Sequence, residues 1–513
     1  MHLFTTIAGL RCYLNSLSQG NGPLEVGLVP TMGALHAGHL SLIQRCRQEN
    51  SVAVVSIFVN PLQFAPQEDF DRYPRNLERD RQVCEQAGVD VIFAPTPEAM
   101  GVVSQPFSPL LTAVVPPEAM TTTLCGRTRL GHFQGVATIV TKLLNVVQPD
   151  RAYFGQKDGQ QLAIIRRLVA DLNLPVEIIA CPTVREPSGL ALSSRNQYLS
   201  ELEKGKAALI YQALQQADKG FRAGERSGVA LVGAVKAVLE QEPAIALEYV
   251  ELVHPTTLAP LTEVEDAGLL AVAVRLGSTR LIDNIVLVAR QPIVAIDGPA
   301  GAGKSTVARR VAQELGLLYL DTGAMYRAIT WLVLQSGIAL DDQPAIAELV
   351  SQADVLISGE PQAVSVSING RDVTQEIRSL EVTAHVSAIA AQSVVRQELL
   401  RLQRRYGLQG GLVIEGRDIG TCVFPDAELK IFLTASVQER ARRRQQDLLN
   451  QGKGEMNLEE LEQTIAERDH KDSTRAIAPL RKAADAIEVN TDDLTIDQVV
   501  NRIIQMYQAR ALS

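Results

Sequence analysis

Short apolar runs rich in β-branched residues alternate with amphipathic stretches over the first 182 residues. Three of these runs predict buried strands, at 24–30, 51–59 and 89–95. Helical patterns follow the first two runs, at 38–49 and within 71–88. Near-continuous apolar strands that alternate with helices are typical of a parallel sheet covered on both faces. The alternation continues through GVATIVTKLLNVVQ, RAYFG and PVEIIACP, which predicts an α/β domain over 1–183.

The pattern changes after residue 183. A polar loop, LSSRNQYLS, and two helical stretches precede three strand-like runs, IALEYVELVH, LLAVAVRL and RLIDNIVLV, which predict a smaller α+β domain over 184–290. The strand IVAIDG then opens a third region, 291–513, whose renewed alternation predicts a second α/β domain. No internal repeat links these regions. A chain of 513 residues is too long for one core, and three domains agree with the two to four expected for this length.

The composition is that of an ordinary globular protein, with 46% hydrophobic and 21% charged residues. The net charge of -9, from 49 basic and 58 acidic residues, disfavours a general nucleic-acid binder, which normally carries a basic excess. Any anionic ligand must therefore be held by local basic clusters. Small molecules are the expected partners.

The number and spacing of the cysteines indicate the redox environment in which the protein works. Six are scattered along the chain without a CxxC pair: Cys12, Cys46, Cys84, Cys125, Cys181 and Cys422. They are expected to be reduced thiols rather than zinc ligands or a redox pair. The first residues lack the basic start and long apolar run of a signal peptide, and no stretch of about 20 apolar residues could span a membrane. A cytoplasmic protein without membrane association is expected.

One glycine-rich loop follows the strand IVAIDG. GPAGAGKST fits G-x-x-x-x-G-K-[ST], a loop whose backbone N–H groups wrap a triphosphate at the start of a helix. Lys304 would reach the β- and γ-phosphates, and the Ser305 hydroxyl would contribute to a magnesium site. The preceding strand and following helix favour this interpretation over a glycine-rich turn without a ligand. The predicted ATP-binding residues are Gly298, Pro299, Ala300, Gly301, Ala302, Gly303, Lys304, Ser305 and Thr306.

Arginine-bearing segments follow this loop: DTGAMYR, EIRS, VVRQELLRLQRR, EGRDIG, RARRR and ERDHKDSTR. Arginine suits bidentate contacts with phosphate, so a second anion is expected beside the ATP phosphates. A guanine-reading NKxD motif is absent from the sequence, which argues against a regulatory GTPase. RARRR, at 440–444, could equally be the solvated face of a helix.

A second loop, PTMGALHAGH, has a different design. His36 and His39 flank a glycine where a strand is expected to become a helix. If the helix begins near Gly38, the imidazoles lie at its positive end and can donate hydrogen bonds to an α-phosphate during nucleotidyl transfer. Two structural histidines at a helix start are the alternative.

Three further loops are expected near the same edge of the sheet. FVNPLQF offers Gln63, FGQKDGQQ offers Lys157, Asp158 and Gln161, and ALSSRN offers Arg195. Ligands of open parallel sheets bind at the carboxyl ends of strands, so these side chains are predicted to form one site with the histidines.

From Gln291 onward the chain resembles bacterial cytidylate kinase, through IDGPAGAGKST, LDTGAMYRA, EIRS, VVRQELLRLQR, EGRDIGT, VFPDAELKIFLTAS and ERDHKDSTRAIAPL. The resemblance implies a P-loop nucleoside monophosphate kinase that phosphorylates CMP and dCMP, with a CMP-binding flap at about 340–410 and a lid at about 440–475. Thr322 stands where serine is common and keeps the hydroxyl. CMP would be bound by Thr322, Arg327, Arg396, Arg417, Asp418, Arg468, Asp472 and Arg475.

Residues 1–290 resemble pantothenate synthetase, also called pantoate–β-alanine ligase, through PTMGALHAGH, SIFVNPLQF, RYPR, GHFQGVATIVTKLLNVVQPD, FGQKDGQQL, GLALSSRNQYL and RLIDN. This implies a Rossmann-like, HxGH nucleotidyltransferase-type domain followed by a small α+β domain. ATP and (R)-pantoate would form pantoyl adenylate and pyrophosphate. The amine of β-alanine would then attack the acyl carbon to give pantothenate and AMP.

The same resemblance implies the ligase site. ATP would contact Met32, Gly33, Ala34, Leu35, His36, Ala37, Gly38, His39, Gly155, Gln156, Lys157, Asp158, Val184, Leu192, Ser193, Ser194 and Arg195. Gln63 and Gln161 would hold pantoate and β-alanine, and His39 would be a general acid. Magnesium would accompany ATP, with Ser305 and Asp158 as candidate ligands, and the ligase part would form a homodimer. Gln156 replaces an acidic residue common in the family.

The chemistry itself weakens the general-acid role, since the pantoate carboxylate is already ionised and the first step needs charge stabilisation more than a proton. The predicted catalytic residues are His36, His39, Lys157, Arg195 and Lys304. The resulting hypothesis is a bifunctional enzyme, a ligase joined to a CMP kinase. Three alternatives stay open: a dinucleotide-forming nucleotidyltransferase as the first part, a kinase for another small acceptor as the second, or one part that only binds.

Overall fold

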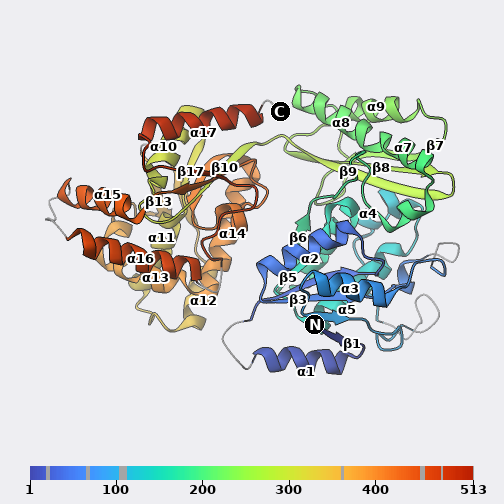
Figure 1. Ribbon diagram of the computed structural model, residues 1–513, viewed down its shortest axis with the longest axis horizontal. Coiled ribbons are helices and arrows are strands. Elements are labelled where there is room, and N and C mark those ends of the chain that lie inside the picture. The colour runs from blue at the N-terminus through green and yellow to red at the C-terminus, as the bar shows by residue number, and fades with distance from the viewer. Residues whose placement is uncertain are drawn as a thin grey trace. The chain divides into compact units, whose positions relative to one another are not determined.

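The computed structural model describes residues 1–18, 24–64, 70–102, 112–359, 363–450, 457–474 and 478–511. The chain divides into two compact units, Met1–Ala289 and Arg290–Ser513 (Figure 1). Each unit is built around its own parallel sheet. The α/β class expected from the alternating pattern is therefore confirmed.

The first unit contains a six-stranded sheet of order β1-β4-β3-β2-β5-β6, in which all pairs are parallel. Its strands are β1 (His2–Phe4), β2 (Val26–Thr31), β3 (Val52–Ile57), β4 (Val91–Phe93), β5 (Arg151–Gly155) and β6 (Glu177–Cys181). The helices around it are α1 (Ile7–Ser18), α2 (Ala37–Glu49), η1 (Pro61–Gln63), α3 (Leu77–Gln86), α4 (Glu118–Thr121), η2 (Leu124–Arg127), α5 (His132–Val147), η3 (Gln156–Asp158) and α6 (Gly159–Asp171).

Both faces of this sheet are buried, which explains the continuous apolar runs. Leu28 and Val54 pack into one cluster with residues of α1, α5 and α6. Their strand neighbours Val29 and Val55 pack into another with residues of α2 and α3. Successive side chains of a strand point to opposite faces, so a strand with two covered faces loses the polar alternation of a half-exposed one.

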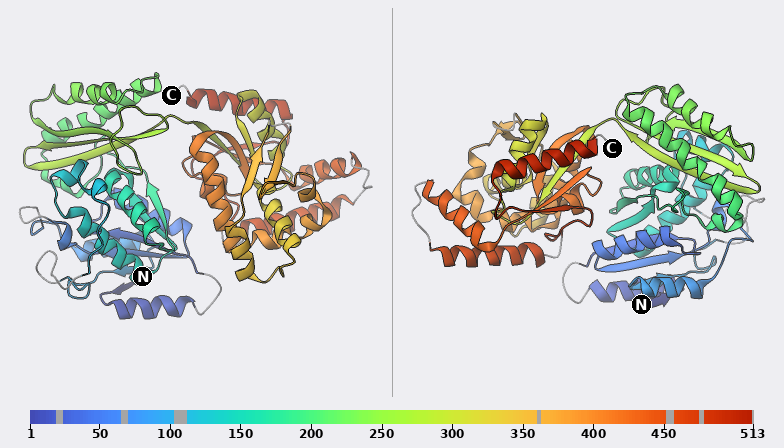
Figure 2. Two further views of the ribbon diagram at one scale, coloured as in Figure 1. Left: turned by 180° about the vertical axis from the view of Figure 1, so that it is seen from behind. Right: turned by 45° about the horizontal axis from the view of Figure 1, so that its top comes forward.

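The smaller domain predicted for 184–290 lies within the same compact unit as the large sheet. Its three antiparallel strands are β7 (Ile245–Val253), β8 (Ala267–Leu276) and β9 (Thr279–Val288). Its helices are η4 (Ser194–Tyr198), α7 (Glu201–Ala207), α8 (Leu209–Arg222) and α9 (Gly228–Leu239), of which α8 and α9 cover one face of these strands (Figures 1 and 2). The other face packs against the α/β part through Leu269 and Ala271, which contact a cluster containing Phe133 and Ile164.

The second unit has a five-stranded parallel sheet of order β11-β15-β10-β16-β17. These strands are β10 (Gln291–Asp297), β11 (Leu318–Asp321), β15 (Gly410–Gly416), β16 (Leu429–Thr434) and β17 (Ile487–Asn490). Three short strands form a separate antiparallel sheet: β12 (Val355–Ser358), β13 (Ser365–Ile368) and β14 (Arg371–Asp372). The helices are α10 (Lys304–Leu315), α11 (Thr322–Ser336), α12 (Gln343–Ser351), η5 (Glu376–Arg378), α13 (Leu380–Ala390), α14 (Ser393–Gln409), η6 (Ile419–Val423), α15 (Val437–Asn450), α16 (Leu458–Thr474) and α17 (Ile496–Ala511).

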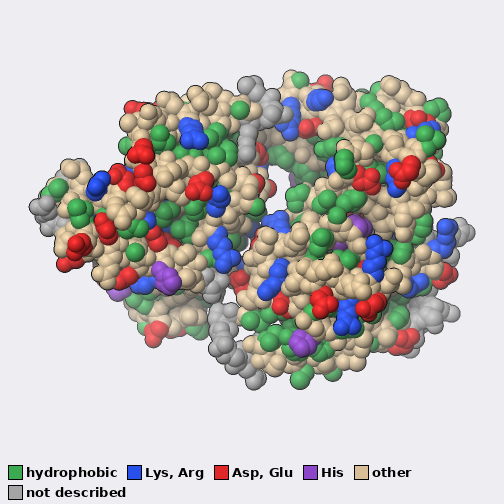
Figure 3. All heavy atoms as spheres, viewed as in Figure 1, with side chains coloured by type: hydrophobic (Ala, Val, Ile, Leu, Met, Phe, Trp, Pro, Cys, Tyr) green, Lys and Arg blue, Asp and Glu red, His purple; other side chains and the backbone are tan. Residues whose placement is uncertain are grey.

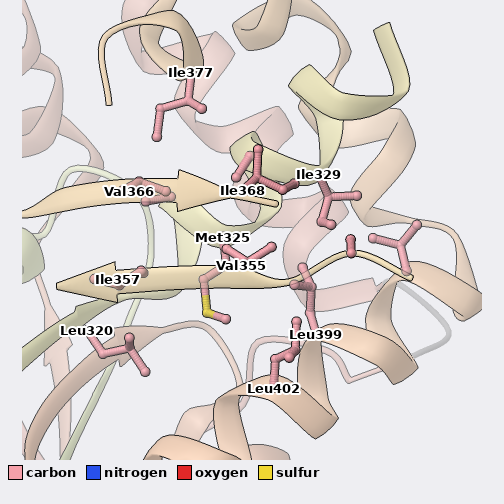
Figure 4. Packing of buried hydrophobic residues seen from close by; sticks show 14 of the residues in the cluster. Leu320, Met325, Ile329, Val355, Ile357, Val366, Ile368, Ile377, Leu399 and Leu402 are labelled. Carbon is pink, nitrogen blue, oxygen red and sulfur yellow. The ribbon is translucent and has the colours of Figure 1, made fainter. Parts of the chain in front are cut away.

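Alternate residues of the central strand β10 again enter two cores. Val294 and Ile296 pack with helices α10 and α17. Ile293 and Ala295 pack on the other side with α11 and α14, in a cluster that also takes up the small sheet. Figure 4 shows this cluster, where Val355 and Ile357 of β12 and Val366 and Ile368 of β13 lie among Met325, Ile329, Leu399 and Leu402. The region expected to bind CMP is thus anchored on the main sheet by apolar packing.

Charged side chains of both signs are interspersed over the face of the molecule drawn in Figure 3. Within the part of the chain that the structure describes, every helix is too short or too polar to traverse a bilayer.

Candidate active sites

The HxGH loop lies at the centre of the first sheet. Strand β2 is flanked by β3 and β5, and the chain leaves it through this loop into α2. The chain runs from β2 through α2 to β3 on one side, whereas the adjacent strand β5 connects through α6 to β6 on the other side. Such a switch point leaves a crevice at the carboxyl ends of the strands, where α/β proteins bind ligands.

The two histidines cap the helix that follows. The His36 Nδ1 atom accepts a hydrogen bond from the Gly38 backbone N–H (3.1 Å), and the His39 Nδ1 atom accepts one from the His36 backbone N–H (3.4 Å). A Cβ on Gly38 would lie 2.9 Å from the His36 ring, which explains the glycine between them. Because both Nδ1 atoms accept, the proton of each neutral ring is on Nε2 and can be donated to a ligand. The structural and functional interpretations of the pair are therefore compatible.

Both imidazoles are held in the neutral form. Burial, followed by the positive charge of Lys157, lowers the pKa of His36. Burial and the neighbouring His36 lower the pKa of His39 to about 3. At neutral pH these groups are hydrogen-bond donors without charge, which argues against His39 as a general acid. The same interactions show that Lys157 and Asp158 lie near the histidines.

A buried carboxylate fixes the start of the HxGH loop. Asp80, on α3 and 2% exposed, accepts hydrogen bonds from the backbone N–H groups of Ala34 (2.9 Å) and Leu35 (2.8 Å). Gly33 and Ala34 have φ angles of 82° and 52°, in the left-handed region that favours glycine. Because non-glycine residues rarely adopt this conformation, Ala34 needs such support from its surroundings.

Gln63 is tied to the same loop and to the start of α5. Its Nε2 atom lies 3.0 Å from the Met32 sulfur, and Asn60 donates to its Oε1 atom (3.1 Å). The backbone carbonyl of Gln63 lies 2.8 Å from His132 Nδ1, and His132 Nε2 lies 3.0 Å from an Arg129 guanidinium nitrogen. Asn60, Arg129 and His132 had no predicted role.

A cleft opens between the α/β part and the small sheet. Lys157, Asp158 and Gln161 line it together with Arg129 and His132. A Cβ built on Gly38 would lie 3.8 Å from the Leu192 Cβ atom. The segment with Ser193, Ser194 and Arg195 therefore adjoins the HxGH loop. The structure thus brings the residues predicted for the ligase site together.

In the second unit the P-loop follows the central strand β10. Gly298, Gly301 and Gly303 all have positive φ angles, and a Cβ on Gly298 would lie 2.1 Å from the Leu433 carbonyl oxygen. Lys304 is 5% exposed, and its ammonium donates to the Pro299 carbonyl (2.8 Å). Burial, followed by the positive charge of Arg417, lowers the pKa of Lys304 to about 7.

Two buried acids support this loop. Glu415, at the end of β15, accepts from the Ser305 hydroxyl (2.9 Å) and bonds to the Tyr319 hydroxyl. Asp297 accepts from the Ile419 and Gly420 backbone N–H groups (2.8 and 2.7 Å), which ties the EGRDIG segment to β10. Burial raises the pKa of Asp297 to about 6 and also raises that of Glu415. Neither acid was predicted as a site residue.

The predicted CMP-binding residues line the neighbouring strands and helices. Thr322 donates to the Glu415 carbonyl (2.7 Å). Three arginines pair with carboxylates: Arg327 with Asp321 (2.9 Å), Arg396 with Asp418 (2.6 Å) and Arg417 with Asp472 (3.0 Å). Surrounding protein atoms and then the charge of Arg417 lower the pKa of Arg468, as expected where positive charge gathers for an anion. Arg475 lies outside the described residues.

The arginine run 440–444 has a mixed role. Arg440 is 3% exposed, pairs with Asp469 and donates to the Ala300 carbonyl of the P-loop (3.1 Å). Arg443 donates to the Thr491 carbonyl (2.7 Å), whereas the Arg442 side chain is 74% exposed. The solvated-face interpretation therefore holds for Arg442, while Arg440 braces the P-loop.

The comparisons with known proteins agree with these two sites. A family model described as "Pantoate-beta-alanine ligase" matches residues 2–286, and one described as "Cytidylate kinase" matches residues 294–509. A protein of Trichormus variabilis named bifunctional pantoate ligase/cytidylate kinase is 62% identical over 530 aligned residues, covering 99% of each chain. The chain belongs to the bifunctional pantoate ligase/cytidylate kinase family.

Other members and solved structures give the same result. A relative of the same name from Synechocystis is 58% identical over 513 residues, with 99% of each chain covered. The crystal structure of pantothenate synthetase from Thermus thermophilus matches with 45% identity and a TM-score of 0.51, covering 56% of this chain and 99% of that one. Both family resemblances expected from the sequence are confirmed. The individual site residues stay predictions.

Proposed function

We propose that the chain catalyses two ATP-dependent reactions. In the first, (R)-pantoate and β-alanine are condensed through pantoyl adenylate to pantothenate, AMP and pyrophosphate. In the second, CMP or dCMP is phosphorylated to the diphosphate. The observation that carries the proposal is the presence of two phosphate-binding loops of different design, each beside its own set of polar groups for a second substrate.

Charge stabilisation is the main task of the ligase residues in the first step. The pantoate carboxylate attacks the α-phosphorus of ATP, and pyrophosphate leaves. Neutral His36 and His39 donate hydrogen bonds from Nε2 to the α-phosphate, where negative charge concentrates in the transition state. Lys157 and Arg195 supply positive charge to the phosphates. Gln63 and Gln161 hold pantoate beside the HxGH loop.

Positioning and charge neutralisation carry the kinase reaction. A phosphate monoester has a second pKa of about 6, so the CMP phosphate is already a nucleophile at neutral pH. Thr322, Arg396 and Arg417 hold it, and Lys304 neutralises the charge that develops on the transferred group. The half-buried arginine–carboxylate pairs keep the guanidinium groups oriented before the substrate arrives.

Magnesium is part of the proposal. Among the described residues no cluster of three or more His, Cys, Asp or Glu side chains is suited to a metal ion. Magnesium carried by ATP does not need such a cluster. The ion commonly keeps several waters and takes one or two protein carboxylates together with substrate phosphates. Ser305 and Glu415 in the kinase unit, and Asp158 in the ligase unit, would hold it. When bound, the ion neutralises phosphate charge. A homodimer and a cytoplasmic location also stay predictions.

The direct test is to assay the purified chain for both reactions. Pyrophosphate release should require pantoate, and pantothenate should form when β-alanine is added. ADP release should be supported by CMP. Pyrophosphate release without pantoate would favour a different nucleotidyltransferase, and a strong preference for AMP or shikimate would overturn the CMP assignment.

ATP binding to the kinase site is expected to take up a proton above neutral pH. The Lys304 pKa of about 7 lies below the 10.5 of an exposed lysine, so at pH 8 the unliganded amine is mostly neutral. Bound polyphosphate raises this pKa again, and the apparent ATP affinity should fall by up to about tenfold per pH unit from pH 7 to 9. Calorimetry at pH 8 in buffers of different ionisation enthalpy measures the uptake. The same titration of Lys304→Gln measures the proton uptake that comes from ATP binding at the ligase site, which is subtracted. An equal uptake by this variant and the unmodified chain would contradict the prediction.

A further inference from the structure

Two adjacent residues of strand β9 each hold a different segment of the ligase site. Asp283 and Asn284 are only 4% and 8% exposed, although they are polar residues between apolar neighbours of the strand. Neighbouring side chains of a strand leave it on opposite faces, so one short stretch can contact two separate segments. The proposed mechanism uses neither residue.

Asn284 holds the turn that carries Lys157. Its Nδ2 atom donates hydrogen bonds to the backbone carbonyl oxygens of Gln156 (3.0 Å) and Lys157 (2.7 Å). This turn, η3, follows β5 and ends at Asp158, at the edge of the cleft. Because one side-chain amide group donates to two consecutive carbonyl oxygens, it fixes the direction in which the turn leaves the sheet.

Asp283 holds the segment that leads to Arg195. Its carboxylate pairs with both terminal nitrogens of Arg185, at 3.0 Å for Nη2, and also accepts the Asn284 backbone N–H (2.8 Å). The Arg185 guanidinium stacks 3.6 Å above the Tyr211 ring and donates to the Gly189 carbonyl (3.2 Å).

Arg185 belongs to a tight reversal of the chain. It forms an antiparallel bridge with Ala191, and the Leu192 backbone N–H donates to the Val184 carbonyl (2.9 Å). The residues after this reversal, Leu192 to Arg195, are predicted to bind ATP and adjoin the HxGH loop. The position of Arg185 therefore sets the position of the segment that follows.

We propose that Asp283 and Asn284 are positioning residues of the ligase, which fix the Gly155–Asp158 turn and the Val184–Arg195 segment relative to each other on the two sides of ATP. This inference rests on the proposed function of the first unit. A buried ion pair such as Arg185–Asp283 is weak support for stability, because desolvation of both charges offsets much of their attraction. The bidentate pairing with Asp283 and the stacking on Tyr211 instead fix the orientation of the Arg185 guanidinium.

The test replaces Asn284 with aspartate, which has almost the same shape but places a carboxylate against two carbonyl oxygens. The turn should move away, and misplacement of Lys157 by about 1 Å should lower kcat/KM for pantoate-dependent pyrophosphate release by about 10²-fold. The KM for ATP should rise more than the KM for pantoate, because both positioned segments belong to the ATP site. Asn284→Gln keeps the amide donors and should recover part of the loss.

Three controls separate positioning from folding. Val286→Thr alters a 44% exposed residue of the same strand and should leave ligase kinetics unchanged. CMP kinase activity of each variant reports on the intact second unit of the same molecule. Thermal unfolding reports on the first unit, and Asp283→Asn provides a second positioning variant if Asn284→Asp does not fold.

The outcomes are distinct. A folded Asn284→Asp or Asp283→Asn chain with the unaltered KM for ATP and unaltered kcat overturns the inference. Ligase loss that only parallels a fall in unfolding temperature, without recovery by Asn284→Gln, shows a structural role and also overturns it. Absence of pantothenate formation by the unmodified chain refutes the proposed function instead.

Discussion

Replacing Lys304 with alanine is expected to abolish the phosphorylation of CMP and to leave pantothenate formation at the rate of the unmodified chain. Lys304 begins α10 directly behind the P-loop and belongs to a compact unit separate from the ligase residues. Removing the cation that neutralises charge on the transferred phosphoryl group should lower kcat by about 10³-fold or more. ADP release in the presence of CMP and pantothenate formation are measured on one preparation of the variant.

The matched control is Lys482→Ala, which removes a half-exposed lysine of the same unit that pairs with Glu488. It should keep both activities. Lys304→Ala should not lower the unfolding temperature, since burial of an ammonium group is itself unfavourable. An equal loss of both activities would contradict independent sites, and kinase activity close to that of the control would exclude Lys304 from the mechanism.

Both phosphate loops were predictable because their geometry is local. A P-loop needs a strand, glycines at fixed positions and a helix, and these follow one another in the short segment IVAIDGPAGAGKST. The HxGH loop likewise joins β2 to α2. The spacing of residues within a short segment therefore predicts the local geometry. The structure has the expected strand, turn and helix in both places.

The residues that brace these loops could not be predicted in the same way. Asp80 contacts Leu35 across 45 residues, Asn284 contacts Lys157 across 127, and Glu415 contacts Ser305 across 110. Contacts at such separations depend on the order of strands in the sheet, which no local pattern specifies. The adjacent polar pair within the apolar run RLIDNIVLV was the visible signal for Asp283 and Asn284, because burial of polar side chains requires partners.

Short elements were missed for a different reason. Strand β1 has 3 residues and β12 and β13 have 4 each, and none lies in a longer apolar run such as VDVIFAP, which revealed the equally short β4. The arginine run 440–444 was ambiguous because sequence alone does not say which face of a helix is buried. Packing against the P-loop and Asp469 decides this, and it buries Arg440 while Arg442 stays in solvent.

Replacing His39 with alanine is expected to lower the rate of pantoyl-adenylate formation by about 10²–10³-fold, the scale for losing one donor to developing charge. His39→Gln should retain much more activity, because glutamine can accept from the His36 backbone N–H and still donate to the α-phosphate. Pantoate-dependent exchange between ATP and pyrophosphate measures this step, with CMP kinase activity as the internal control. A glutamine variant as inactive as the alanine variant, together with a rate inflection near the ordinary imidazole pKa of 6.5, would show that His39 acts as an acid. A pKa of about 3 predicts the opposite, since the ring is then neutral throughout the working range and acts only by donating its Nε2–H.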